Sequence, residues 1–395
     1  TSHTSIMAKA LEVPAVVGLH NISAVVSSGD LILIDGAKGL VFTNPSEERL
    51  EEYRKRAEEQ KLIMEELSTL RDKPPQTRDG YLVPITANIE LLEDLDAVGA
   101  RGAKGIGLFR TEFLFLGAER LPDEDEQFEA YVRAAKSQHP SPVVMRTLDL
   151  GADKMPSGFE NLDELNPFLG DRAIRLCLSR PELFKTQLRA ILRASVHENI
   201  RMMYPMISCV QEVMDANTLL RQCMIELSKE GVAFNQEIQI GTMIEVPSAA
   251  LIADIIAPHV SFFSLGTNDL IQYTMAVDRG NENVAHLYKP THMAIIRLID
   301  HVVKVSHKNG LWTCVCGQMA ADPRLVPLLI GLGVDELSVS PSLAPMIKDV
   351  IRKLYYSDAV ELAQKALNSS SAEHVEQLCH EMIQSIAPEV LEISE

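Results

Sequence analysis

The sequence predicts an α/β protein whose main part is a (β/α)8 barrel of the TIM type over residues 80–395. Three observations lead to this prediction. Short apolar runs follow one another beyond Gly80, stretches of helical periodicity separate them, and together they fill about the length of one closed barrel. The eight runs are YLVPITANI, GAKGIGLFR, PVVMRTLDL, IRMMYPMI, IQIGTMIEV, VSFFSLGT, WTCVCG and DELSVS.

An open, doubly wound sheet is the competing architecture, because it also joins parallel strands through right-handed crossovers. That fold commonly carries Gly-x-Gly-x-x-Gly after its first strand, and YLVPITANI is followed by no such pattern. A barrel would place its chemistry at the carboxyl ends of the strands. The residues at these ends are Asn88, Arg110, Arg146 with Asp149, Pro205, Glu245, Asn268 with Asp269, Cys316 and Ser340.

The first part of the chain has a different pattern. Residues 1–45 contain two strand-like runs, VPAVVG and LILIDGAKGLVFTNP, the second with a glycine-containing turn. Residues 46–79 predict a long linker helix, with Ser46 as its N-cap and acidic residues in its first turn. Two prolines in RDKPPQTRDG end the helix, since proline cannot continue it. We therefore expect domains at 1–45, 46–79 and 80–395.

The net charge of −18, from 37 basic and 55 acidic residues, argues against nucleic acid or an anionic membrane as the partner. A small anion needs only a local group of arginines and is not excluded. No apolar run reaches the length of about 20 residues that a membrane span needs, and no signal peptide is recognisable. The six irregularly spaced cysteines are typical of reduced thiols, so the sequence predicts a cytoplasmic protein without membrane insertion.

Arginines gather where the apolar runs end. Arg110 in GLFRTEFLF and Arg146 in VVMRTLDLG each follow a predicted strand, NPFLGDRAIR adds Arg172, and AVDRGN adds Arg279. A buried guanidinium stays charged and binds phosphate or carboxylate through two parallel hydrogen bonds. In so acidic a chain this favours a small, densely charged anion such as a phosphorylated carboxylate. The alternative is structural ion pairing, for example of Arg110 with Glu112.

Two carboxylates, Glu245 in TMIEVPSAA and Asp269 in SLGTNDLIQY, end consecutive predicted strands. Hard oxygen ligands beside an anion site suit Mg²⁺ or Mn²⁺, which complete their shell with water and substrate oxygens. Alternatively, Asp269 only caps the following helix together with Asn268. The Asn268 side chain and the nearby amides also suit a phosphate at a helix N-terminus.

For two further residues, Cys316 and His3, the sequence alone leaves the role open. Cys316 in CVCGQMAAD ends a predicted strand, where a thiol facing arginines and a metal ion can exchange a proton, although most buried cysteines are inert. His3 in TSHT has an imidazole that can attack phosphorus, although a lone histidine near a chain end is more often only solvated.

Five segments together resemble the phosphoenolpyruvate–protein phosphotransferases, enzyme I of the bacterial phosphoenolpyruvate-dependent sugar phosphotransferase system. The resemblance extends over essentially the whole chain, and its clustered motifs occur in the expected order. It implies a (β/α)8 barrel that binds phosphoenolpyruvate and Mg²⁺ and forms a homodimer. It also implies that residues 1–45 are a remnant of the swivelling phosphohistidine domain. The segments are TSHTSIMAKALEVPAVVG, GLFRTEFLF, NPFLGDRAIR, LGTNDLIQYTMAVDRGN and CGQMAADP.

The resemblance also implies roles for individual residues. It places the phosphate and carboxylate of phosphoenolpyruvate on four side chains, with Arg172 at the same mouth. It assigns Glu245 and Asp269 to the metal, Cys316 to the protonation of the enolate that gives pyruvate, and His3 to the phosphorylated histidine. The four substrate-binding side chains are those of Arg110, Arg146, Arg279 and Asn268.

Some features depart from the family pattern. Gln318 stands where the family commonly has glutamate, and Ala152 where it commonly has glycine. The region that docks the histidine-containing phosphocarrier protein, and most of the histidine domain, would lie before Thr1. A pyruvate phosphate dikinase or phosphoenolpyruvate synthase, a nitrogen-related paralogue of enzyme I and a non-catalytic phosphoenolpyruvate-binding regulatory module remain alternatives.

Overall fold

The structure is a computed structural model that describes residues 13–19, 21–36, 38–151 and 165–394. The chain divides into two compact units. The larger unit is Arg71–Ile386, and the smaller one comprises Thr1–Leu70 together with Ala387–Glu395. The finer division at residues 45 and 79 stays a prediction.

The smaller unit is built on a pair of antiparallel strands, β1 and β2, and one long helix, α3. Ring contacts pack α3 on the strands, with the rings of Phe42 and Tyr53 5.9 Å apart. The Ser46 hydroxyl accepts a hydrogen bond from the Arg49 amide at 3.3 Å, which confirms the expected N-cap. The elements of this unit are α2 (Ile22–Val25), β1 (Ile32–Asp35), β2 (Leu40–Thr43), α3 (Glu47–Ser68) and α18 (Pro388–Ser394).

One expectation for this region is wrong. The run VPAVVG, residues 13–18, forms no strand, whereas the second run forms β1 and β2. A β-branched run favours an extended backbone, but a strand also needs a neighbour to complete its hydrogen bonds. In the described part of this unit, the sheet consists of β1 and β2 alone.

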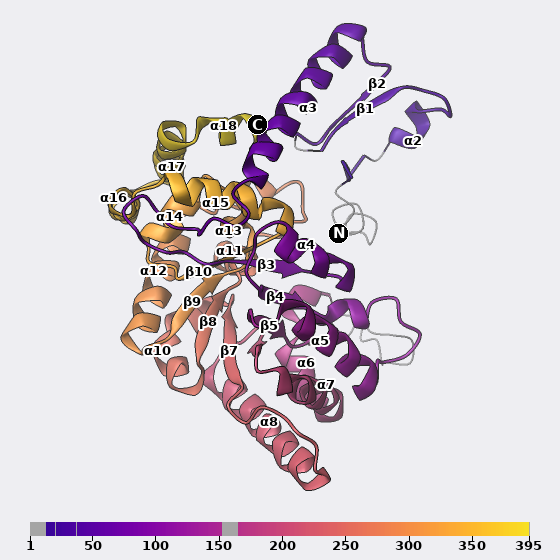
Figure 1. The fold of residues 1–395 in the computed structure, drawn as a ribbon, viewed down its shortest axis with the longest axis vertical. Helices are drawn as coiled ribbons and strands as arrows, with labels where there is room; N and C mark the ends of the chain where they lie inside the picture. The colour runs from indigo at the N-terminus through magenta and orange to yellow at the C-terminus, as the bar shows by residue number, and fades with distance from the viewer. Residues whose placement is uncertain (1–12, 20, 37, 152–164, 395) are drawn as a thin grey trace. The chain divides into compact units, whose positions relative to one another are not determined.

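The larger unit is a closed barrel of eight parallel strands, in the order β10-β3-β4-β5-β6-β7-β8-β9. Helices surround these strands (Figure 1). The predicted (β/α)8 architecture is therefore confirmed, and each of the eight apolar runs contributes one strand. The strands are β3 (Ile85–Ile89), β4 (Ile106–Arg110), β5 (Val143–Arg146), β6 (Ile200–Tyr204), β7 (Gln239–Ile244), β8 (Phe262–Leu265), β9 (Trp312–Val315) and β10 (Glu336–Val339).

Each strand is followed by one or more helices that return the chain to the start of the next strand. After β10, the last helices continue the outer layer. The helices are α4 (Leu95–Ala100), α5 (Glu124–Gln138), α6 (Ile174–Ser179), α7 (Pro181–Ala194), α8 (Val210–Glu230), α9 (Pro247–Leu251), α10 (Ala253–Ile256), α11 (Thr267–Met275), α12 (Met293–Lys308), α13 (Gln318–Ala321), α14 (Val326–Gly331), α15 (Ala344–Lys353), α16 (Tyr356–Leu367) and α17 (Ala372–Ile386).

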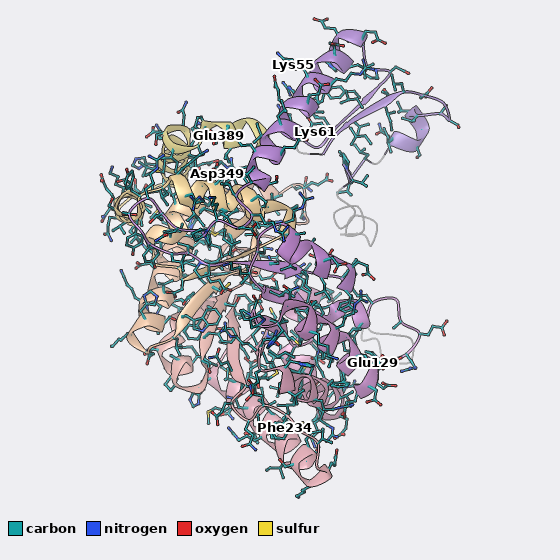
Figure 2. All side chains as sticks on the ribbon, in the orientation of Figure 1. Lys55, Lys61, Glu129, Phe234, Asp349 and Glu389 are labelled. Atoms are coloured by element: carbon teal, nitrogen blue, oxygen red, sulfur yellow. The ribbon has the colours of Figure 1, made fainter. Side chains whose placement is uncertain are left out.

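Most strand residues are buried on both faces, because side chains fill the barrel interior and helices cover its outside. β5, β8 and β10 are buried along their whole length. Side chains occupy the space between strands and helices (Figure 2), and α5 turns Ala130 and Tyr131 inward while Glu129 is exposed. This close packing makes the barrel a rigid frame for the residues at its rim.

The six cysteines are free thiols. Within the described ranges, no helix combines the length and the apolar character that crossing a membrane requires.

Candidate active site

The barrel brings the predicted arginines and carboxylates to one rim. Arg110 and Arg146 end β4 and β5, and their Cα atoms are partners in the parallel ladder. Glu245 directly follows β7, Asp269 lies in the first turn of α11 after β8, and Cys316 follows β9. Because all eight strands are parallel, these positions share the carboxyl end of the barrel.

Arg146 and Arg172 are held by two buried carboxylates. Arg146 is 3.1 Å from Glu112 and 2.9 Å from Asp149. Arg172 is 2.7 Å from the other oxygen of Asp149. Burial opposes the charge of Arg146, but Glu112 and Asp149 outweigh it and raise the pKa of the guanidinium. Burial also acts to raise the pKa of Asp149, yet Arg146 and Arg172 hold it below its ordinary value.

Arg110 is paired differently from the sequence-based alternative. Its guanidinium donates to Glu90 and is about a third exposed, whereas Glu112 pairs with Arg146. Sequence reasoning missed the role of Glu90, which follows β3. Glu112 lies two residues after Arg110 in RTEFLF, and its apolar neighbours were a signal that its carboxylate is buried.

A second layer of hydrogen bonds supports the backbone around Arg146. The Thr111 hydroxyl donates to the Arg146 carbonyl at 3.0 Å. The Gln187 amide donates to Thr111 at 3.1 Å, and its oxygen accepts from the Leu148 amide at 2.8 Å. Tyr131, buried on α5, accepts from the same Gln187 at 3.2 Å. These contacts fix the end of β5, and with it the direction of Arg146.

Glu245 and Asp269 form the acidic part of the rim. Glu245 is 1% exposed and accepts a hydrogen bond from the Met206 amide at 2.6 Å. Burial, with the charges of Asp269 and Asp149, raises the pKa of Glu245 to about 8, and Arg146 offsets this only in part. This carboxylate therefore lacks a full positive partner.

The surroundings of Glu245 are shaped for a close approach. A Cβ atom at Gly266 would lie 2.6 Å from a Glu245 oxygen, so only glycine leaves room for the carboxylate. Met206, whose amide binds Glu245, has a positive φ of 56°. A non-glycine residue adopts this conformation at a cost, and such residues are enriched at functional sites.

Asp269 does not cap its helix, so the alternative that it serves only as a helix cap is wrong. The N-cap of α11 is Gly266, with no side-chain capping bond, and Asp269 lies inside the first turn. One Asp269 oxygen is 3.6 Å from Arg279, and that buried oxygen makes no hydrogen bond. No cluster of three or more metal-ligating side chains occurs in the described ranges, so these two carboxylates would need water and substrate oxygens to complete a shell.

Asn268 connects the ends of two neighbouring strands. Its side-chain oxygen accepts a hydrogen bond from the Gln318 amide at 2.8 Å, which directs the amide NH₂ group elsewhere and leaves it suited to an anion. The Gln318 side chain is exposed and borders a hollow of about 300 Å³. Gln318 thus differs from the family's usual glutamate in an exposed side chain, while the backbone amide of Gln318 supports Asn268.

Cys316 is 3% exposed, and burial, with the charge of Glu245, raises the pKa of its thiol. A raised pKa keeps the proton on sulfur at neutral pH, as an acid requires. Ser264 donates a hydrogen bond to the sulfur at 3.3 Å, a contact that sequence reasoning missed. His3 and Ala152 lie outside the described residues.

The structure therefore brings an arginine group, a carboxylate pair and a thiol together at the rim of a barrel, an arrangement suited to a phosphorylated carboxylate. The family of PEP-utilising enzymes matches this chain in two places. Its PEP-binding domain matches residues 64–356, and its mobile domain matches residues 1–39. The chain thus belongs to the PEP-utilising enzymes, within the phosphoenolpyruvate-protein phosphotransferase family.

Curated relatives named phosphoenolpyruvate-protein phosphotransferase are similar along nearly the whole chain. The Staphylococcus carnosus protein is 47% identical over 96% of this chain and 66% of its own length. The Listeria monocytogenes protein has the same values, and the Haemophilus influenzae protein is 45% identical over 97% of this chain and 67% of its own. The chain therefore spans about two thirds of the length of these relatives.

Among solved structures, a citrate lyase from Burkholderia xenovorans matches with a TM-score of 0.37 and 13% identity, covering 68% of this chain and 79% of its own. This likeness is too small to support an inference.

Proposed function

We propose that this chain is the phosphoenolpyruvate-binding part of a phosphoenolpyruvate–protein phosphotransferase. The reaction transfers the phosphoryl group of phosphoenolpyruvate to a histidine, then to a phosphocarrier protein, and releases pyruvate. The observation that carries the proposal is the rim itself, where Arg110 and Arg146 are partners on adjacent strands and Glu245 and Asp269 follow β7 and β8. The names of the relatives support the same activity.

In this proposal the arginines bind and orient the substrate. Arg110 and Arg279 are more than a third exposed, so they are placed to meet an incoming phosphate or carboxylate. Arg146 and Arg172 are largely buried and fixed by Glu112 and Asp149, which orients their guanidinium groups. Asn268 adds a neutral donor. Fixed donors cost no reorganisation during the reaction, which is why they stabilise the charge that develops on a transferring group.

The residues that would hold Mg²⁺, or Mn²⁺, are Glu245 and Asp269. They fit a divalent cation, because the buried Asp269 oxygen lacks a hydrogen bond and Glu245 is under-compensated by positive charge. Both are hard oxygen donors. When bound, the metal supplies neutralising charge for the phosphoryl group.

Cys316 is the proposed acid, and His3 the proposed phosphate acceptor. The acceptor imidazole attacks phosphorus in line, the enolate of pyruvate leaves, and its carbon takes the proton of the Cys316 thiol. The assignment of His3 rests on the resemblance of TSHT and on the match of residues 1–39 to the mobile domain.

The proposed partners follow from the same family. They are a histidine-containing phosphocarrier protein and a second copy of the chain joined through the barrel. The proposed location is the cytoplasm, and neither nucleic acid nor a membrane is among the proposed partners.

The proposal is tested by binding and by exchange. Calorimetric titration with phosphoenolpyruvate and Mg²⁺ should give binding that Arg110→Ala and Arg279→Ala weaken by tenfold or more, about 1.5 kcal/mol for a lost charged hydrogen bond. Arg193→Ala, which removes two ion pairs between α7 and α5 away from the rim, is the control and should bind normally. Equal binding by all three variants would contradict the proposal.

Isotope exchange between pyruvate and phosphoenolpyruvate separates an enzyme from a binding module. It is measured on the chain joined to the part of the Staphylococcus carnosus relative that this chain does not match. Exchange is expected; binding without exchange would identify a regulatory module instead. This exchange needs no nucleotide in either kind of enzyme, so transfer of the phosphoryl group from the histidine to AMP, rather than to a phosphocarrier protein, would favour the dikinase or synthase alternative.

A further inference from the structure

A buried hydroxyl lies directly against the thiol that we propose as the acid. Ser264 is on β8 and Cys316 directly follows β9, the strand that pairs with β8. Ser264 is 1% exposed and Cys316 is 3% exposed. The Ser264 hydroxyl donates to the Cys316 sulfur over 3.3 Å. Buried hydroxyls have hydrogen-bond partners, and those of Ser264 are the thiols of Cys316 and of Cys314, its ladder partner on β9.

The position of Cys316 is fixed on several sides. Its thiol donates to the Leu265 carbonyl at 3.6 Å, and its backbone amide donates to the same carbonyl at 3.2 Å. The Asn88 side chain donates to the Cys316 carbonyl at 2.9 Å. The sulfur thus has an acceptor for its proton in Leu265 and a donor to its lone pair in Ser264.

The charges around the sulfur act in both directions. Burial raises the pKa of the Cys316 thiol, the Ser264 hydrogen bond lowers it, the Glu245 charge raises it, and Arg146 and Arg110 lower it. Cys314, which lies opposite Ser264 on β9, interacts with the Cys316 sulfur electrostatically and also has a hydrogen bond with the Ser264 hydroxyl. Ser264 is the neighbour in this set that touches the sulfur through a side-chain hydrogen bond.

We propose that Ser264 is a positioning residue for Cys316: its hydroxyl orients the thiol and then donates to the sulfur that remains when the proton has moved to carbon. This inference rests on the proposed function. In the step, the S–H bond breaks and its electron pair stays on sulfur. The C–H bond of the pyruvate methyl group forms from the electron pair of the enolate double bond, while the enolate oxygen becomes the carbonyl. Water returns the proton to sulfur.

The first test titrates Cys316 itself, without metal or substrate. Cysteine labelled with ¹³C at Cβ reports ionisation by NMR, and Cys316→Ser assigns the signal. Ser264→Ala should raise the pKa of Cys316 by about one to two units, the value of a lost hydrogen bond to a charged group. Thr242→Val is the matched control, because it removes a buried strand hydroxyl that donates to Tyr204 and not to sulfur.

A second pair of variants keeps the test independent of packing. Ser264→Thr and Ser264→Val have nearly the same shape and differ in the hydroxyl, so only the valine variant should shift the ionisation of Cys316. Equal values in the threonine and valine variants, or an unchanged value in Ser264→Ala, overturn the proposal. If Ser264→Ala does not fold, this pair decides alone.

The second test follows the chemistry. Cys316 as thiolate removes a methyl proton from pyruvate in the reverse direction, so the chain with Mg²⁺ should exchange the pyruvate methyl protons for deuterium in D₂O. Ser264→Ala should slow this exchange about tenfold at neutral pH and recover as the pH rises. A slower exchange with an unshifted pH profile overturns the role of Ser264. If Cys316→Ser exchanges as fast as the parent chain, the proposed acid fails, and the NMR titration still decides whether the hydrogen bond acts on the sulfur.

Discussion

Replacing Asp149 by Asn removes the charge that joins two buried arginines. The Asp149 side chain is 5% exposed, and its two oxygens lie 2.9 Å from Arg146 and 2.7 Å from Arg172. With Glu112 the group holds two positive and two negative charges, so the variant leaves one positive charge uncompensated. Breaking a buried ion pair from one side costs about 3–5 kcal/mol, because the remaining charge stays out of water. We expect the free energy of unfolding to fall by about 3 kcal/mol, since asparagine keeps one acceptor oxygen.

A surface pair provides the matched control. Asp125 is 2.7 Å from Arg193, but its side chain is 79% exposed. Asp125→Asn should cost less than about 1 kcal/mol, as is usual for exposed ion pairs. Urea unfolding is followed through the fluorescence of Trp312, the one tryptophan in the chain, which lies on β9. Equal losses in the two variants would refute the reasoning.

The difference in stability between the parent chain and Asp149→Asn should depend on pH in a definite direction. The folded protein holds the pKa of Asp149 below the ordinary value of 3.8. The carboxylate therefore stabilises the fold at pH values above 3.8, and this contribution is lost as the pH falls through the folded pKa. The stability gap between the parent chain and Asp149→Asn should be constant near neutral pH and shrink below pH 3.8. A gap that grows on acidification would contradict the assigned direction.

Two further predictions concern the carboxylate pair. Glu245→Gln removes one of the two proposed metal ligands, so phosphoenolpyruvate should bind this variant equally weakly in Mg²⁺ and in EDTA. The parent chain should bind phosphoenolpyruvate more weakly in EDTA than in Mg²⁺. Calorimetry measures both affinities, and a persistent effect of Mg²⁺ on the variant would exclude Glu245 as a ligand. Gly266→Ala places a Cβ 2.6 Å from a Glu245 oxygen, so it should weaken Mg²⁺-dependent binding tenfold or more, while Gly99→Ala, with open space around its Cβ, should bind normally. Normal binding by Gly266→Ala would show that Glu245 moves freely.

Much of the fold could be predicted from the sequence. A parallel barrel buries both faces of each strand, so its strands are recognisable as short apolar runs. The rim residues could be predicted for the same reason, since Arg110 and Arg146 stand at the ends of apolar runs. The run VPAVVG was misjudged, because its residues favour an extended backbone but local preference does not supply a neighbouring strand.

The ion pairs and hydrogen bonds between side chains at the rim could not be predicted from the sequence. Glu112 is nearest to Arg110 along the chain, yet it binds Arg146 on the adjacent strand. Ser264 and Cys316 are separated by 52 positions and meet only because β8 and β9 pair. Such contacts depend on strand register and on the depth of each side chain, which periodicity does not specify.

These pairings change the meaning of the arginine group. Arg146 and Arg172 already have buried carboxylate partners, so they are not free cations waiting for an anion. Arg279 is bound more loosely, 3.6 Å from Asp269, and its side chain is 38% exposed. A divalent cation on Asp269 would compete for this carboxylate and release the guanidinium for substrate. Metal and anion should therefore bind cooperatively. Arg279→Ala should reduce this cooperativity, measured by calorimetry as the effect of Mg²⁺ on phosphoenolpyruvate affinity, without weakening the binding of the metal alone, because the competing guanidinium is gone and the metal ligands stay intact.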